Sequence, residues 1–360
     1  MIFLALFVIL LYFLYKGGNK DIKGFVIVTA VIMAVMAGLR HEGVGSDTYG
    51  TMMSYERFAG TSWSEVFQRV VLMYLHPDSE VGKDPGEIIF FKLLSYINTS
   101  GRFMIMVVAC ITMLFVGNFF YKNSRTMEEA LFGFIFYITM FYQYLPNSSV
   151  RQSLSVAIVL FAYRYLEKKK VFKYIVIVLF ASLFHKSAIL ALSFCPIYYF
   201  SNVKLIYKLS FPVFVLALVF YREIALFLSF GSDIYSAYGQ SQFYSGNAKP
   251  FMVIIMIGIM HFIGIIGLSR DTNVENNRLM YICSIMTFVL VPMIWADPSL
   301  LRIIAYSGPW MGIMVSRCLK LQFTNNANVI LALIILVFLY RLAVTTDQFA
   351  FMWQNMYVDN

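Results

Sequence analysis

The chain has 360 residues, of which 60% are hydrophobic and 13% charged, and its formal net charge is +9. Its mean hydropathy of +0.73 is far above the range of soluble globular proteins. The apolar residues form many runs of about 15 to 22 residues, the length at which a helix crosses a hydrocarbon layer of about 30 Å. This pattern excludes a soluble enzyme with a single core. It predicts an all-α polytopic membrane protein.

We predict about 12 transmembrane helices, with a range of 10–12, in one integral membrane domain over residues 1–360. The first run lacks a basic segment and a cleavage site, so we expect a retained span rather than a signal peptide. A longer gap, 40–102, contains an amphipathic stretch at 63–75 and an apolar run at 88–97, and we expect it to be an extracytoplasmic loop region. The candidate spans are 1–15, 22–39, 103–121, 130–145, 150–166, 172–184, 187–201, 209–230, 251–269, 279–296, 303–316 and 328–344.

The positive charge is distributed as the positive-inside rule requires. With the N-terminus outside, the predicted inner loops carry sixteen basic and six acidic residues, a balance of +10, and the rest of the chain has a balance of −1. The basic excess therefore indicates membrane orientation, and we expect no nucleic-acid partner. Nearly all unusual polar residues fall on the predicted outer face.

The sequence offers no signal for a metal or nucleotide site. Its four cysteines lie in or beside apolar runs without paired spacing, which is typical of small buried residues rather than disulfides or metal ligands. It also has no DxD-like pair, HExxH, Walker A or GxGxxG pattern. We therefore expect no metal and no cofactor.

The first candidate site segment follows the run 22–39. Gly38, Gly43 and Gly45 would let the backbone turn tightly beside a ligand. Arg40 is either an interfacial anchor or a diphosphate ligand, because its guanidinium fork suits phosphate oxygens. Asp47 either pairs with Arg40 or orients or deprotonates a sugar hydroxyl.

The second segment begins at Pro146, which ends one run. Asn147 or Ser148 can cap the next helix, which places Arg151 in its first turn. A cation is disfavoured there by the helix dipole unless an anion is near, and the helix N-terminus attracts the same anion. Arg151 is therefore the best phosphate candidate, with a lipid headgroup contact as the alternative.

The third segment contains His185 and Lys186 between two apolar runs. We take His185 as the imidazole of the membrane-spanning region. It is either an interhelical hydrogen-bond donor or a group for proton transfer, to which its near-neutral titration is suited. Lys186 would favour the neutral imidazole and add positive potential.

Three further segments carry weaker signals. Glu87 lies beside an expected helix start, where Asp84 and Glu87 fit simple capping as well as chemistry. Trp295 and Arg302 form an aromatic–arginine pairing suited to sugars, although an interfacial aromatic belt also explains the tryptophan. The outer loop 231–250 is rich in tyrosine and amide side chains that could contact sugars.

These motifs resemble, in order, those of the EpsG family, a branch of the Wzy-type polysaccharide polymerases. The matching segments are Gly38–Arg40, Val44–Tyr49, Pro85–Phe90, Arg151–Ala157 and Phe184–Ala188. The segment Pro85–Phe90 departs from the usual Glu-Pro-Gly-Phe order, and Arg151–Ala157 has serine at position 155 where alanine is commoner.

The resemblance implies a GT-C-like enzyme of the bacterial plasma (inner) membrane with its active site facing outward. Such an enzyme joins undecaprenyl-diphosphate-linked oligosaccharide repeat units into O-antigen, capsule or exopolysaccharide. Donor and acceptor would both be lipid-linked and held in the bilayer, and a chain-length regulator protein would be a partner.

The roles implied for the residues follow from a diphosphate leaving group. The cations Arg40, Arg151, Arg302 and Lys186 would neutralise its charge, and His185, Asp47 or Glu87 would accept the proton of the acceptor hydroxyl. The remaining predicted substrate contacts are Tyr49, Gln152 and Trp295.

Two alternatives stay open. An O-antigen ligase-type transferase would carry its large outer loop late in the chain, whereas here the longest one is early. A transporter or flippase of lipid-linked sugars often shows two related halves, and none is visible.

Overall fold

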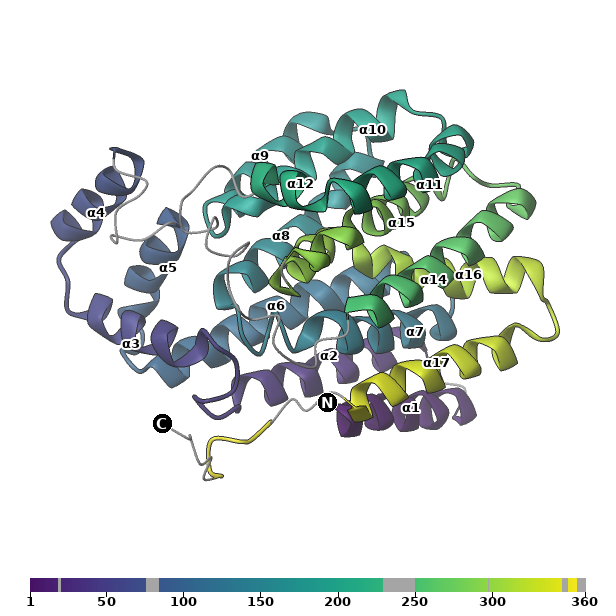
Figure 1. Ribbon diagram of the computed structural model, residues 1–360. Helices are drawn as coiled ribbons and strands as arrows, with labels where there is room; N and C mark the ends of the chain where they lie inside the picture. The colour runs from purple at the N-terminus through teal and green to yellow at the C-terminus, as the bar shows by residue number, and fades with distance from the viewer. Residues whose placement is uncertain (19–20, 76–83, 229–249, 297, 345–348, 355–360) are drawn as a thin grey trace.

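The computed structural model describes residues 1–18, 21–75, 84–228, 250–296, 298–344 and 349–354, and these ranges are built from helices (Figure 1). The only β-type pairing within them is an isolated bridge between Arg40 and Phe351. In chain order the helices are α1 (Ile2–Gly17), α2 (Ile22–Gly38), α3 (Thr48–Ala59), α4 (Trp63–Leu75), α5 (Pro85–Ser95), α6 (Gly101–Asn123), α7 (Met127–Tyr137), the π-turn η1 (Ile138–Tyr142), α8 (Val150–Glu167), α9 (Val171–Ser182), the 3₁₀-helix η2 (Lys186–Ser193), α10 (Phe194–Phe200), α11 (Val203–Val219), α12 (Tyr221–Leu228), α14 (Pro250–Arg270), α15 (Arg278–Leu290), the 3₁₀-helices η5 (Val291–Trp295) and η6 (Pro298–Tyr306), α16 (Gly308–Gln322) and α17 (Ala327–Val344).

The all-helical prediction is confirmed for the described residues, and several helices are suited to a membrane. By length and composition, four of the described helical segments can cross one. Shorter apolar helices are found at Ile2–Gly17, Ile22–Gly38, Val171–Ser182 and Lys186–Phe200. The count of twelve stays a prediction. The four long segments are Gly101–Asn123, Phe251–Arg270, Arg278–Trp295 and Ala327–Val344.

Several predicted spans are interrupted, and proline accounts for two interruptions. The expected span 187–201 is a 3₁₀-helix followed by a short α-helix that starts at Phe194, which places Pro196 in its first turn. Proline is tolerated there because its missing N–H would have no helical partner. Pro292 similarly coincides with the change from α15 to η5 within 279–296.

Other boundaries were wrong for local reasons. The expected span 209–230 begins earlier, at Val203, because the Asn202 side chain accepts a hydrogen bond from the backbone N–H of Leu205. It is then divided at Phe220 into α11 and α12. The span 130–145 contains a π-helix after Tyr137, and 303–316 begins as a 3₁₀-helix before α16 starts at Gly308.

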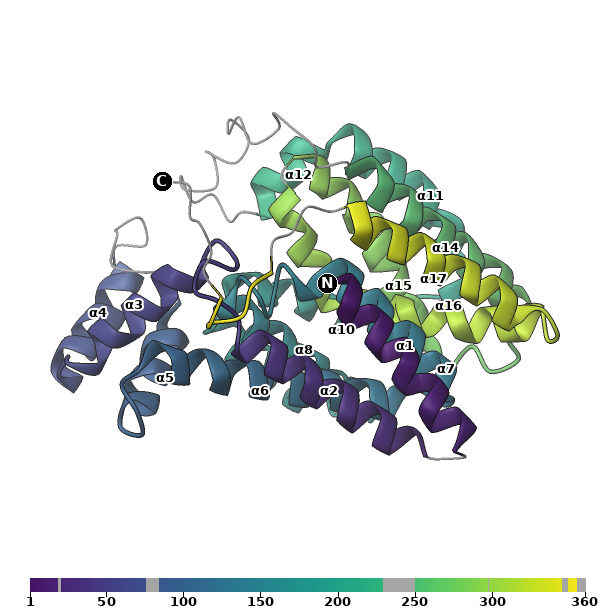
Figure 2. The ribbon, with the colours of Figure 1, turned by 90° about the horizontal axis from the view of Figure 1, so that it is seen from below.

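The predicted loop region 40–102 is itself helical. Helices α3, α4 and α5 form a group that projects beside the main bundle (Figures 1 and 2). The predicted amphipathic stretch is α4, with the bounds expected. Buried Tyr55, Phe91, Ile105 and Phe184 share one apolar cluster, which attaches this group to α6 and to the chain after α9.

At one end of the bundle, charged side chains form a closed network, which we call the network end. Arg317 donates to both carboxylate oxygens of Glu129, at 3.1 and 2.8 Å, and to Asn277 Oδ1 at 2.9 Å. Its Nη2 also donates to the backbone oxygen of Asn123, at the last residue of α6. Lys16 and Lys320 both pair with Glu128 there.

Candidate active site

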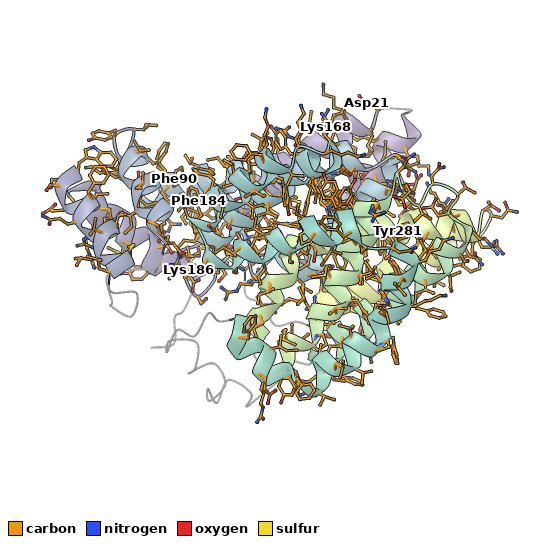
Figure 3. The ribbon with its side chains drawn as sticks, turned by 90° about the horizontal axis from the view of Figure 1, so that it is seen from above. Asp21, Phe90, Lys168, Phe184, Lys186 and Tyr281 are labelled. Atoms are coloured by element: carbon orange, nitrogen blue, oxygen red, sulfur yellow. The ribbon has the colours of Figure 1, made fainter. Side chains whose placement is uncertain are left out.

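The other end of α6, about 30 Å away along the helix axis, holds the predicted functional residues, and we call it the site end. Arg102, the second residue of α6, donates to the backbone oxygen of Arg40 at 2.8 Å. Figure 3 shows the two ends: Asp21 and Lys168 lie together on one side of the bundle and Lys186 lies on the other.

We call residues 38–49 the first motif, residues 146–153 the second motif and residues 184–188 the third motif. The first and second motifs contact each other through Gly45. Its φ is +83°, and a Cβ at this position would lie 2.0 Å from the backbone oxygen of Asn147. Only glycine therefore fits this close approach. Of the three motif glycines, Gly45 is the one with positive φ, whereas Gly38 ends α2. Across the contact, Ser46 Oγ and Ser148 Oγ are 3.2 Å apart.

The third motif is joined to α5 in a similar way. The backbone N–H of Gly86 donates to the oxygen of Leu183 at 2.8 Å, and a Cβ on Gly86 would meet Leu183 atoms at 2.9 Å. The Phe90 and Phe184 rings pack edge to face next to this contact (Figure 3). Asp84 and Glu87 are thereby held beside the segment that contains His185.

Arg151 lies in the first turn of α8, as predicted, and its guanidinium group pairs with two carboxylates. Its Nη1 is 2.9 Å from Asp84 Oδ2 and its Nε is 3.7 Å from Glu87 Oε1. Asp84 is the N-cap residue of α5 and Glu87 lies in its first turn, as the sequence predicts, but the Asp84 side chain makes no capping hydrogen bond. Asn147 and Ser148 are likewise not the cap of α8, whose N-cap is Ser149.

The Glu87 carboxyl has an unusual environment. Its side chain is only 18% exposed. Burial raises the pKa of Glu87 to about 7, and the nearby Arg151 only partly opposes this effect. Glu87 therefore holds its proton to a higher pH than an ordinary carboxyl group, which suits a group that exchanges protons.

His185 lies in an extended break between α9 and η2, and its ring is tied to the next turn. His185 Nδ1 is 2.6 Å from Ser187 Oγ, and Ser187 Oγ is 2.9 Å from the hydroxyl of Tyr306. The side-chain amide of Gln152 donates to Ser187 Oγ and to the backbone oxygen of Arg302, both at 3.4 Å. The second motif, the third motif and η6 therefore meet at these residues.

Asp47 and Arg302 form the link back to the first motif. Arg302 Nη1 is 3.8 Å from Asp47 Oδ2, a long ion pair between partly exposed groups. Arg302 Nε is buried and has no hydrogen-bond partner. The predicted alternative in which Asp47 pairs with Arg40 was wrong, since Asp47 faces Arg302 instead.

Arg40 is buried, with 1% of its surface exposed. Its Nε donates to Thr48 Oγ1 at 3.2 Å and its Nη1 donates to the backbone oxygen of Ala37, whereas Nη2 has no partner. Burial lowers the pKa of Arg40 to about 10, so the guanidinium remains charged at neutral pH. The residue is thus no snorkelling anchor. It carries an unsatisfied cationic N–H group.

The C-terminal segment also reaches this end, which the sequence did not indicate. The backbone N–H of His41 donates to Ala350 at 2.8 Å, and that of Met352 donates to Leu39 at 2.9 Å. These bonds flank Arg40 on both sides in the chain. The short pairing has no strand pattern in the sequence, so only the structure could locate it.

Three of the predicted site residues take no part in the contacts described above. Lys186 is exposed next to His185, and Tyr49 is 57% exposed on the first turn of α3. Trp295, at the end of η5, is partly buried. The tyrosine-rich loop 231–250 lies outside the described residues except at its last position.

One imidazole was overlooked. His261 lies inside α14, so taking His185 as the imidazole of the membrane-spanning region was wrong. The His261 ring is buried and stacks on Tyr207 and Phe288, and its Nε2 lies 2.8 Å from Ser210 Oγ. Its partners belong to α11 and α15.

Comparison with known proteins identifies the family of the chain. No curated protein and no solved structure matches the chain. Residues 23–358, nearly the whole chain, match the EpsG family. That range includes every site residue discussed above and most of the apolar helices. The chain is an integral membrane protein that belongs to the EpsG family.

Proposed function

We propose that this protein is a polysaccharide polymerase that joins undecaprenyl-diphosphate-linked oligosaccharide repeat units at the outer face of the bacterial plasma membrane. Its architecture would then be of the GT-C-like type. One observation carries the proposal: three arginines from separate segments, Arg40, Arg151 and Arg302, gather with His185 at one end of the bundle. Family membership supports the same general activity.

The arginines suit a diphosphate leaving group. Arg40 Nη2 and Arg302 Nε are buried cationic donors without a partner, so both have hydrogen-bonding capacity that the fold does not use. Donors held in a low-dielectric place stabilise developing negative charge more strongly than donors in water. Arg151 contributes positive charge that Asp84 and Glu87 balance in the absence of substrate.

The proposed reaction needs one proton acceptor. The bond between the donor's anomeric carbon and its diphosphate oxygen breaks, the acceptor hydroxyl oxygen bonds to that carbon, and the hydroxyl proton passes to a base. The electron pair leaves on the diphosphate. His185 is the proposed base, with Glu87 and Asp47 as the other candidates, and Gln152, Lys186, Tyr49 and Trp295 would contact the substrates.

The outer-face location is part of the proposal. It is supported by the charge distribution, because Lys16, Arg317 and Lys320 of the predicted inner loops lie at the network end. The lipid tails of donor and acceptor would then lie in the bilayer beside the bundle. Their glycans would lie over α3, α4 and α5.

A reaction of the purified full-length protein with defined undecaprenyl-diphosphate-linked repeat units tests the function. We expect lipid-linked products longer by whole repeats. Transfer of the glycan to a lipid without diphosphate would instead indicate a ligase. Movement of the substrate across vesicles without a new bond would indicate a transporter, and either result would overturn the proposal.

Two variants connect the activity to the site. Arg151→Ala and His185→Ala should abolish elongation while the protein is still produced and folded. Lys320→Ala, at the network end, is the matched control and should elongate like the wild type. Normal chain lengths in both site variants would show that these residues are not used.

A further inference from the structure

A chain of four hydroxyl and imidazole groups runs from His185 into the core. His185 Nδ1 is 2.6 Å from Ser187 Oγ, Ser187 Oγ is 2.9 Å from the Tyr306 hydroxyl, and that hydroxyl is 3.3 Å from Ser155 Oγ. Ser155 Oγ then donates to the backbone oxygen of Ala181 at 3.0 Å. Ser155 and Tyr306 are buried, so protein groups rather than bulk water set the direction of these bonds.

The last bond fixes the direction of all the others. A hydroxyl has one proton, and a carbonyl oxygen can only accept. Because Ser155 gives its proton to Ala181, Tyr306 must donate to Ser155. Ser187 must in turn donate to Tyr306, since the Tyr306 proton is already used. The Ser187 proton is then unavailable to His185, so His185 Nδ1 must be the donor in the first bond.

The Gln152 amide agrees with this direction. Its N–H group donates to Ser187 Oγ at 3.4 Å. A serine hydroxyl accepts two hydrogen bonds and donates one. Ser187 therefore accepts from His185 and Gln152 and donates to Tyr306, which uses its full capacity.

We propose that Ser187, Tyr306 and Ser155 are positioning residues that hold neutral His185 in the Nδ1–H tautomer and leave Nε2 as the proton-accepting atom. A backbone carbonyl sets this polarity, and a carbonyl oxygen has no proton of its own to donate. The same Ala181 oxygen also accepts the backbone N–H of His185 at 3.3 Å, which ties the residue and the end of the chain to one atom. Tyr163 supports the arrangement by donating to the backbone oxygen of Tyr306 at 2.7 Å.

The catalytic consequence rests on the proposed function. A base needs its lone pair on the nitrogen that meets the acceptor hydroxyl, and the other nitrogen must be held by a partner. The hydrogen-bond chain would provide that partner at Nδ1. The tautomer itself is a property of the resting protein and does not depend on the reaction.

Nitrogen NMR of the full-length protein in lipid bilayers tests the tautomer directly. With ¹⁵N-labelled histidine, a His185→Gln variant assigns the signal among the four histidines. We expect the wild-type His185 to be protonated at Nδ1. In Tyr306→Phe the Ser187 proton is released to donate to Nδ1, so the signal should change to the Nε2–H form.

Two further variants keep the test decisive. Ser155→Ala should also shift the tautomer, and it provides the answer if Tyr306→Phe fails to fold. Tyr174→Phe is the control, because it removes another buried hydroxyl, which donates to Ala191 at 2.6 Å, without touching the chain. An Nε2–H signal in the wild type, or an unchanged signal in both chain variants, would overturn the proposal.

Elongation kinetics separate this proposal from the proposed function. Tyr306→Phe should lower kcat by about a hundredfold, the contribution typical of a general base, with KM nearly unchanged. If the wild type shows the Nδ1–H form but never elongates a glycan, the positioning chain stands and the polymerase assignment fails. If the wild type elongates and the tautomer is Nε2–H, the polymerase assignment stands and the positioning chain fails.

Discussion

Two arginines at opposite ends of the bundle are both buried but are satisfied differently. Arg317 at the network end binds both oxygens of Glu129, Asn277 and a backbone carbonyl. Arg40 at the site end binds Thr48 and one carbonyl, and its Nη2 has no partner. A buried charged donor without a partner lowers the free energy of unfolding. A protein therefore retains such a donor where it serves another purpose, such as binding a ligand.

The ion pairs follow the same division. Arg317 and Glu129 are in close two-point contact and less than 10% exposed, whereas Arg302 and Asp47 are 3.8 Å apart and partly exposed. A closed, dry pair fixes the structure, and a long, open pair can be separated by a ligand at little cost. The comparison therefore indicates a stabilising role for the network end and supports the proposed substrate binding at the site end.

The largest effect is expected from Arg317→Ala. The substitution leaves the Glu129 carboxylate buried without its partner, which typically costs about 3–5 kcal/mol of unfolding free energy. Chemical denaturation in detergent micelles measures the loss. Lys16→Ala is the control and should cost less than about 1 kcal/mol, because the Lys16 side chain is 49% exposed.

Arg40→Ala should give the opposite profile. We expect a loss of about 10²–10³ in the rate of elongation, as for removal of one donor to a developing anion. The stability loss should be smaller than for Arg317→Ala, because the fold leaves one Arg40 donor unused. If both variants lose the same stability, and if their activities fall only in proportion to the fraction of folded protein, the two ends do not differ in role.

Glu87 should make the free energy of unfolding depend on pH. Since its folded pKa of about 7 is above the usual carboxyl value, the folded protein holds this proton where the unfolded chain has lost it. Stability should therefore fall as the pH rises from about 4.5 to 7, by an amount on the order of 3 kcal/mol. Denaturation of wild type and Glu87→Gln across this range measures it. A slope retained in the variant would assign the effect to another group.

A local effect is expected from Gly45→Ala, at the contact between the first and second motifs. The added Cβ must displace the Asn147 carbonyl, and the positive φ is strained for alanine by about 1–2 kcal/mol. Elongation should fall because the first and second motifs separate. Gly50→Ala is the matched control, because a Cβ there meets nothing within 4 Å. Similar activities of the two variants would mean that the contact is unimportant.

The fold class and the grouping of the motifs could largely be predicted from the sequence. Apolar runs, and loops with an excess of basic residues, directly reflect the requirements of the bilayer. The ends of the spans were less readable, since a proline such as Pro196 shifts a helix type without altering hydropathy. Within the site, the sequence indicated Arg151 but not its partner. The pairing with Asp84 depends on the contact between Gly86 and Leu183, about 100 residues apart in sequence.

Tyr306 illustrates the same limit. An isolated tyrosine in an apolar run has the pattern of a core residue, and it is one. Its hydroxyl becomes informative only because η2 and α8 bring Ser187 and Ser155 to it. Long-range hydrogen bonds of this kind leave no spacing in the sequence.

Binding of undecaprenyl diphosphate, compared with undecaprenyl monophosphate, tests the division between the two ends most directly. The account predicts that the wild type prefers the diphosphate and that Arg302→Ala weakens its binding at least about tenfold, a loss of about 1.4 kcal/mol. Lys320→Ala at the network end should bind like the wild type. Unchanged diphosphate binding in Arg302→Ala, or an equal loss in Lys320→Ala, would contradict the account.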